Sequence, residues 1–119
     1  SIDTCRELAS LVENVYGGRG RTHPATKTFQ ALRIYVNGEL TALQRALEAS
    51  GTTLKAGGRL CVISYHSLED RLVKNFFRQE KANGHFRVLA VKPITPSAAE
   101  VSERNPAARS AKLRGGQKL

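Results

Sequence analysis

The sequence contains few of the residues that build aromatic cores, metal centres or disulfide frameworks. Its 119 residues include no Trp and no Met, aromatic residues make up only 6%, and there are two cysteines, Cys5 and Cys61. Two cysteines without a CxxC pair cannot by themselves complete a tetrahedral zinc site. Because each lies within an apolar pattern, we expect both to be small core residues of a protein from a reducing compartment.

Several functional signatures are also missing. The sequence shows no signal peptide and no apolar run long enough to cross a membrane, which favours a cytoplasmic protein with no membrane partner. It has no GxxxxGK[ST] loop and no HExxH motif, and Gly17–Gly20 follows a helical pattern rather than a strand, so we expect no dinucleotide fingerprint and no metal site. Ser67, His66 and Asp70 are too close together at a helix start to form a hydrolytic triad.

Positive charge is in excess. The formal net charge is +9 and the sequence pI is about 10.2, which favours a polyanionic partner such as nucleic acid, although many small domains are moderately basic for solubility alone. The basic residues fall in a glycine-rich loop, along one helix and near the end of the chain: Arg19, Arg21; Arg71, Lys74, Arg78, Lys81; Arg104, Arg109, Lys112, Arg114.

The first third of the chain predicts two helices. Residues 3–16 have helical apolar spacing, and Thr4 with Glu7 matches a capping box, with Gly17–Gly18 ending the helix before the basic loop Gly17–Thr22. A second, longer helix is expected from Pro24 to about Ala49, interrupted by Gly38 at a cost of about 1 kcal/mol relative to Ala. Its apolar stripe steps by three or four residues: Phe29, Leu32, Val36, Leu40, Leu43, Leu47.

The remainder predicts alternating strands and helices, and therefore an α/β fold. Arg59–Tyr65 is a continuous apolar run, typical of a strand covered on both faces in a parallel sheet. Ser67 and Asp70 match a capping box that opens a helix over Leu68–Lys81. The later elements are a strand at Phe86–Val91, a short helix capped by Ser97 with Glu100 that stops by Asn105-Pro106, a strand at Ala111–Arg114, and a frayed GGQKL tail.

Two groups of polar residues are candidates for chemistry. His66, Ser64 and Ser67 follow a strand at a helix start, where ligands of open α/β sheets bind, although capping alone explains Ser67. On the long helix, polar residues form a stripe that could hydrogen-bond RNA, although the pattern alone favours an ordinary solvated face. This stripe comprises His23, Thr26, Gln30, Arg33 and Asn37.

Three ordered blocks of sequence resemble a known family. HPATKTFQALRIYVNGEL (23–40), LKAGGRLCVISYHSLEDRLVKNFF (54–77) and KPITPSAAEVSERNPAARSAKLR (92–114) are similar to the C-terminal half of bacterial 16S ribosomal RNA cytosine-N4 methyltransferases of the MraW type. The resemblance implies part of a class I, Rossmann-like methyltransferase sheet, preceded by helices of an inserted substrate-recognition region. Residues 1–37 would end that insertion, and residues 38–119 would belong to the α/β core.

The resemblance also implies a function. The family transfers a methyl group from S-adenosylmethionine to a cytidine of the small-subunit decoding centre, so the implied partners are 16S ribosomal RNA and the small ribosomal subunit. For such an activity we hypothesise that His66 is catalytic and that substrate is contacted by His23, Gln30, Arg33, Asn37, Ser64 and Ser67. The family's glycine-rich cofactor loop and ribose-binding acid match nothing here, so we expect most of the cofactor site to lie upstream and the fragment alone to be inactive.

The sequence departs from the family pattern at one position, and two alternatives to the methyltransferase interpretation stay open. Ala107 stands where the family usually has Arg, which removes one expected phosphate contact. A non-catalytic, basic RNA-binding module would explain the charge equally well. A homodimer is a further alternative, because a truncated sheet would leave an apolar edge exposed.

Overall fold

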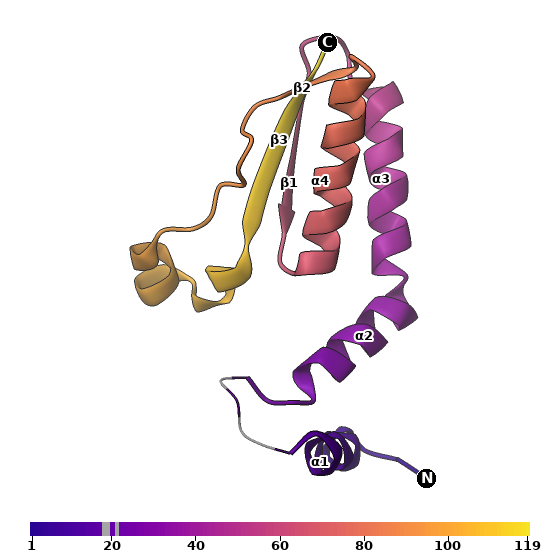
Figure 1. Cartoon of the computed structure of the whole chain (residues 1–119), viewed down its shortest axis with the longest axis vertical. Coiled ribbons are helices and arrows are strands. Elements are labelled where there is room, and N and C mark those ends of the chain that lie inside the picture. The colour runs from indigo at the N-terminus through magenta and orange to yellow at the C-terminus, as the bar shows by residue number, and fades with distance from the viewer. Residues whose placement is uncertain (18–19, 21) are drawn as a thin grey trace. The chain divides into compact units, whose positions relative to one another are not determined.

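The computed structural model describes residues 1–17, 20 and 22–119, which form two compact units, residues 1–39 and residues 40–119 (Figure 1). Half of the loop GGRGRT (17–22), including Arg19 and Arg21, lies outside the described residues. Assignment of residues 1–37 to an RNA-facing insertion and of 38–119 to a methyltransferase core stays a prediction. No helix in the described part of the chain has both the length and the apolar character needed to cross a membrane.

The first unit begins with helix α1 (Cys5–Tyr16), and its predicted start is confirmed. Thr4 is the N-cap: its hydroxyl accepts a hydrogen bond from the Glu7 N–H at 3.2 Å, and the Glu7 carboxylate accepts one from the Thr4 N–H at 3.1 Å. Gly17 ends the helix. Cys5 is exposed, so its prediction as a core residue is wrong, because α1 buries none of its residues.

A single long helix over residues 24–49 was predicted, and this is wrong. Helix α2 (Thr26–Asn37) ends at Gly38, and α3 (Glu39–Thr53) begins immediately after it. Gly38 has a left-handed backbone, with φ of 60°, and its N–H is donated to the carbonyls of Ile34 and Tyr35. Such a glycine ends a helix, because only glycine adopts this conformation without a steric penalty from Cβ.

The second unit contains a small three-stranded sheet. Strands β1 (Arg59–Ser64) and β2 (Phe86–Val88) both pair with β3 (Lys112–Lys118), and both pairings are antiparallel. The expected parallel pairing is therefore wrong for these strands. Because β1 and β2 each run opposite to β3, they run in the same direction as each other but are separated by it.

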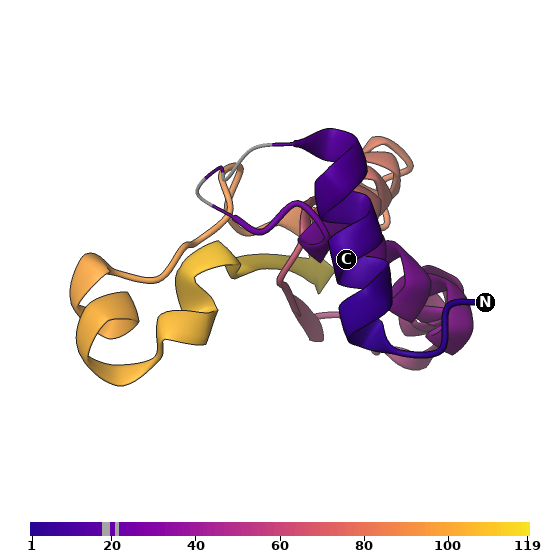
Figure 2. The same cartoon turned by 90° about the horizontal axis from the view of Figure 1, so that it is seen from below.

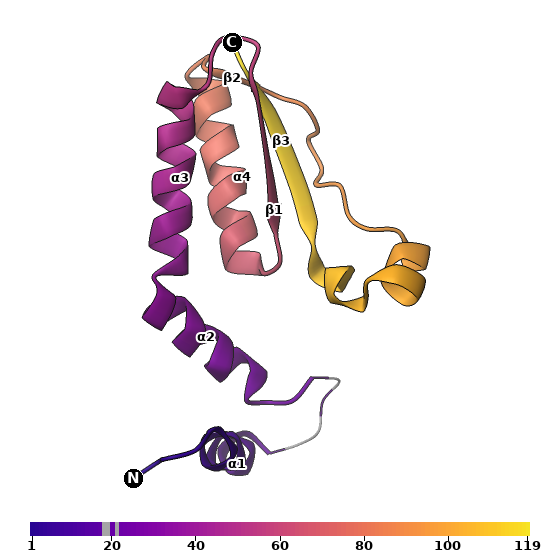
Figure 3. The same cartoon turned by 180° about the vertical axis from the view of Figure 1, so that it is seen from behind.

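One face of this sheet is covered by α3 and by α4 (Ser67–Ala82), which lie side by side (Figure 3). The core beneath them is built from Leu47, Val73, Phe77 and Phe86. Burial alternates along β1, and Cys61 and Ile63 on the opposite face are exposed. The predictions of a strand covered on both faces and of Cys61 as a core residue are thus wrong, since helices cover only one face in the described chain.

The C-terminal residues form the middle strand of the sheet. The predicted frayed tail is wrong, because Gly115–Lys118 continue β3 and pair with both neighbours. A Cβ atom on Gly116 would lie 2.5 Å from the Phe77 ring, so the glycine allows this aromatic side chain to pack directly on the strand.

The segment before β3 contains two short helical turns, a π-helix at Glu100–Arg104 and a 3₁₀ helix at Pro106–Ser110. Ser97 accepts a hydrogen bond from the Glu100 N–H at 3.1 Å, as predicted, and the first turn stops before Asn105. Seen from below, these turns lie beyond β3, on the side away from α3 and α4 (Figure 2).

Candidate functional site

The junction between β1 and α4 places His66 at the start of a 16-residue helix. His66 has an extended backbone, is the N-cap of α4, and accepts a hydrogen bond through Nδ1 from the Glu69 N–H at 3.3 Å. The Glu69 carboxylate in turn accepts a hydrogen bond from the Tyr65 N–H at 2.9 Å. The helix therefore starts with a His-x-x-Glu arrangement, and the predicted Ser67–Asp70 capping box is wrong by one residue.

The local hydrogen bond determines which imidazole nitrogen carries the proton. Because Nδ1 accepts a hydrogen bond, the proton of a neutral ring lies on Nε2. The imidazole is only 8% exposed, and Nε2 is buried with no hydrogen-bond partner among the described residues, although the Glu69 carboxylate lies 3.3 Å away without hydrogen-bond geometry. His66 thus holds a buried N–H donor that an incoming acceptor could use.

A buried ion pair ties the first turn of α4 to β3. Asp70 is 8% exposed and accepts two hydrogen bonds from Arg114, from Nε at 2.8 Å and from a terminal nitrogen at 3.3 Å, with Lys112 Nζ also 3.3 Å away. The hydrogen bond from Arg114 is the main reason why the pKa of Asp70 is lowered. Sequence reasoning missed this contact, because the partners are 44 residues apart.

The two serines of the junction have different surroundings. Ser64 is 3% exposed and its hydroxyl is donated to the Lys112 carbonyl at 3.4 Å, whereas Ser67, the first residue of α4, is exposed. Of the two candidates for a substrate contact, exposure favours Ser67.

The predicted polar stripe lies in the first unit, and several of its residues already have partners. Arg33 pairs with Glu39 at 2.9 Å, and the Asn37 amide donates to the same carboxylate at 3.4 Å. His23 precedes α2 and accepts a hydrogen bond through Nδ1 from the Ala25 N–H at 3.1 Å. Gln30 is partly buried on α2. Substrate contact by this group stays a prediction, and an RNA phosphate would compete with Glu39 for Arg33.

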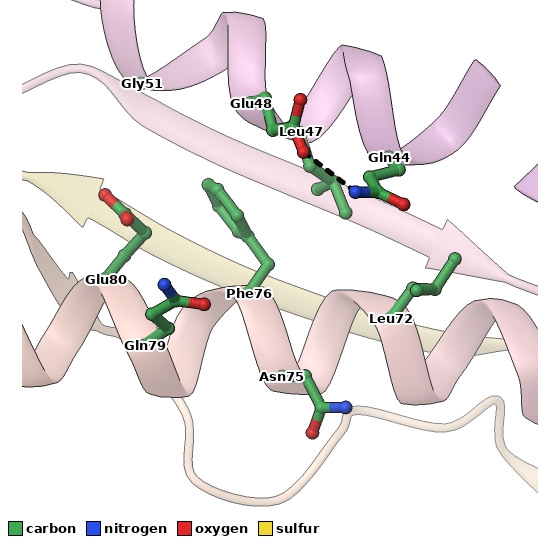
Figure 4. A pocket seen from close by; sticks show the side chains of 9 residues that line it. All are labelled: Gln44, Leu47, Glu48, Gly51, Leu72, Asn75, Phe76, Gln79 and Glu80. Atoms are coloured by element: carbon green, nitrogen blue, oxygen red, sulfur yellow. Dashed lines mark hydrogen bonds between the residues drawn. The ribbon is translucent and has the colours of Figure 1, made fainter. Parts of the chain in front are cut away.

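A groove of about 400 Å³ lies between α3 and α4 (Figure 4). Leu47 and Phe76 point toward each other across it, and the rim carries amides and two carboxylates, with Gln44 donating to Glu48 at 2.9 Å and Glu80 3.0 Å from the His85 ring. The rim residues contribute no cation. This groove is therefore unsuited to a phosphate or a nucleic-acid backbone.

Two carboxylates near the β1–α4 junction, Asp70 and Glu69, already have partners. The buried acid of the second unit, Asp70, is paired with Arg114 and Lys112, and Glu69 caps the start of α4. Neither carboxylate is available to hold the ribose hydroxyls of a nucleoside. Neither of the two therefore fits the role of a ribose-binding acid in a site for S-adenosylmethionine.

The described chain has an α/β fold with a buried histidine at a strand-to-helix turn. The model of the MraW methylase family matches residues 1–119, and the chain belongs to that family.

Curated relatives agree with this assignment. The chain is 50% identical to the ribosomal RNA small subunit methyltransferase H of Persephonella marina, over 99% of the chain and 41% of that protein. It is 55% identical to the protein of the same name from Coprothermobacter proteolyticus, over 95% of the chain and 38% of that protein. The Thermomicrobium roseum protein is 48% identical over 99% of the chain and 41% of its own length. The chain thus spans about two fifths of these relatives.

Proposed function

We propose that the chain is the C-terminal part of an S-adenosylmethionine-dependent methyltransferase that modifies the N4 amino group of a cytidine in the decoding centre of 16S ribosomal RNA. The observation that carries this proposal is the family match over all 119 residues, and the curated relatives bear the name of a small-subunit ribosomal RNA methyltransferase. On this proposal the methyl donor is held mainly by residues outside the chain, the fragment alone is inactive, and the protein works in the cytoplasm.

The chemistry requires accurate placement of a weak nucleophile. The lone pair of the cytosine amino group is delocalised into the ring, so transfer depends on the orientation of the base and on its removal from the RNA stack. His66 is suited to orienting the base, because its buried Nε2–H can donate a hydrogen bond to the ring nitrogen or carbonyl oxygen of cytosine. Ser67 is an additional contact, and Gln30, Arg33, Asn37 and His23 would hold flanking RNA.

Methyl transfer from labelled S-adenosylmethionine to small ribosomal subunits tests the proposal. The assay compares the full-length protein that carries this chain with the 119-residue chain, and mass spectrometry locates the methyl group. We expect the full-length protein to produce N4-methylcytidine. RNA binding without transfer by the full-length protein would instead support a non-catalytic RNA-binding module.

Two variants separate the proposed catalytic role of His66 from its role as a helix cap. His66→Ala removes both, and we expect it to lower the free energy of unfolding by about 1 kcal/mol. Asparagine is an equally good N-cap but has no N–H donor in the position of Nε2, so His66→Asn should retain stability and lose methyl transfer by about a hundredfold. Unchanged transfer by His66→Asn would leave His66 with a capping role only.

Dimerisation stays a prediction. The open face of β1 exposes Ile63, 57% exposed, and Cys61, and an apolar face of this kind is where a second copy would pack. Sedimentation equilibrium of the chain measures the mass directly.

A further inference from the structure

A second groove lies on the other side of α4, between that helix and the chain that follows β2. Its volume is about 200 Å³, below the roughly 300–1,000 Å³ of pockets that enclose small molecules. Four basic side chains line it, namely Lys74, Arg78, Lys81 and Arg114, and the lining includes no acidic residue. A shallow groove of one charge is better suited to part of a polymer than to a whole ligand.

Three of these cations are available to a ligand. Arg114 is neutralised by Asp70, but within the described chain the side chains of Lys74, Arg78 and Lys81 have no ion pair or hydrogen bond, and all three residues are exposed. They are four and three residues apart and so lie along one side of α4, covering roughly 10 Å of the helix axis. Such a row of cations can contact neighbouring phosphates of one strand.

Part of the groove's lining is apolar. This part includes Val88, Ala90 and Val91, and Val91, which lies beyond the end of β2, is 88% exposed. A cationic row beside an apolar surface matches single-stranded RNA, whose phosphates and unpaired bases lie side by side. A duplex has the same phosphates but keeps its bases stacked inside, where these apolar side chains cannot reach them.

We propose that this groove, formed by Lys74, Arg78 and Lys81 with Val88, Ala90 and Val91, binds a single-stranded segment of RNA. The cations neutralise consecutive phosphates, and one unstacked base covers Val91. The proposal rests on the proposed function, because that function is the reason to expect RNA as a partner. It adds a contact surface on α4 that is separate from the β1–α4 junction and from the polar stripe of the first unit.

Fluorescence anisotropy with a labelled oligouridylate, measured over a range of salt concentrations, tests whether the three cations contact phosphates. Each phosphate contact on a single strand contributes about 0.7 to the slope of log affinity against log salt, so the triple variant Lys74→Gln, Arg78→Gln, Lys81→Gln should reduce the slope by roughly 2. At about 0.1 M salt, removal of the same contacts should weaken oligouridylate binding by about a hundredfold. The matched control, Lys55→Gln, Arg59→Gln, Arg71→Gln, removes equal charge outside the groove.

Equal losses in the two triple variants would overturn the proposal, because they would show an effect of net charge alone. Circular dichroism and thermal melting of each variant show that it is folded, as expected for exposed side chains.

Val91→Ser tests the apolar part of the lining. We expect oligouridylate binding to fall by about fivefold, at the lower end of what a base contact with an aromatic side chain provides. Binding of heparin, a polyanion without bases, should stay unchanged. Equal effects on both ligands, or none on either, would refute a site for unpaired RNA.

Methyl transfer to small subunits is measured separately for the full-length protein. If unaltered protein transfers no methyl group, the proposed function fails, while the salt slopes still decide whether the groove binds RNA. If transfer occurs and the salt slopes of the two triple variants agree, the proposed function stands and only RNA binding by the groove is excluded.

Discussion

The two sides of α4 face different neighbours and carry opposite charge. Toward α3, the groove around Phe76 has a rim of amides with Glu48 and Glu80. Toward the chain after β2, the groove beside Phe77 is lined by cations, among them Lys74 and Arg78. Successive residues of a helix point about 100° apart, so neighbours in the sequence separate onto different sides. One amphipathic helix thus offers two surfaces, and only one of them suits an anion.

The largest effect on stability is expected at Gly116 of β3, against which Phe77 of α4 packs. A Cβ atom at Gly116 would lie 2.5 Å from Phe77 and 3.3 Å from Phe86, both of which are buried and cannot move easily. We expect Gly116→Ala to lower the free energy of unfolding by about 3 kcal/mol, the upper part of the range for overpacked cores. Urea denaturation measures this. Gly84→Ala, with open space around the new methyl group but φ of 74°, is a control for backbone strain alone.

A smaller effect on the free energy of unfolding is expected at the ion pair between Asp70, at the start of α4, and Arg114 of β3. Asp70→Asn keeps the shape of the side chain but removes its charge, and we expect a loss of about 2 kcal/mol at neutral pH, typical of a hydrogen bond between charged groups. Because folding lowers the pKa of Asp70, its contribution is present above the unfolded pKa of about 4 and is lost as pH falls through the folded value.

The free energy of unfolding of the unaltered chain should therefore decline below about pH 4 more steeply than that of Asp70→Asn. Urea denaturation over a series of acidic buffers compares the two slopes. Parallel curves would show that Asp70 titrates alike in the folded and unfolded chain.

The smallest effect on stability is expected in the acidic groove between α3 and α4, at Glu48 of α3. Glu48→Gln should change the free energy of unfolding by less than about 0.5 kcal/mol, because Glu48 is exposed and its partner is a neutral amide. It should leave the salt slope of oligouridylate binding unchanged, in contrast with the cation variants on the opposite side. A change in slope as large as theirs would mean that the two sides of α4 are not distinct in RNA binding.

Local patterns in the sequence predicted three of the elements well. The helix at 5–16 with its Thr4 cap, the strand from Arg59 and the helix that follows it are all close to their predicted bounds. The position of His66 between strand and helix was also predicted. Its role as the N-cap was missed, because Ser67 is the more usual capping residue, although Glu69 three residues after His66 was a readable signal.

The sequence by itself determined the features whose interacting residues lie within about one helical turn of each other, because capping bonds and helical periodicity are local. It also carried the three blocks that identify the family. Only the tertiary structure decided that β3 lies between β1 and β2, that one face of the sheet is open, and that Asp70 pairs with Arg114. Each of these depends on segments tens of residues apart, whose register no local pattern encodes. The charge of α4 was visible in the sequence, but its division between two grooves arises from what packs on each side.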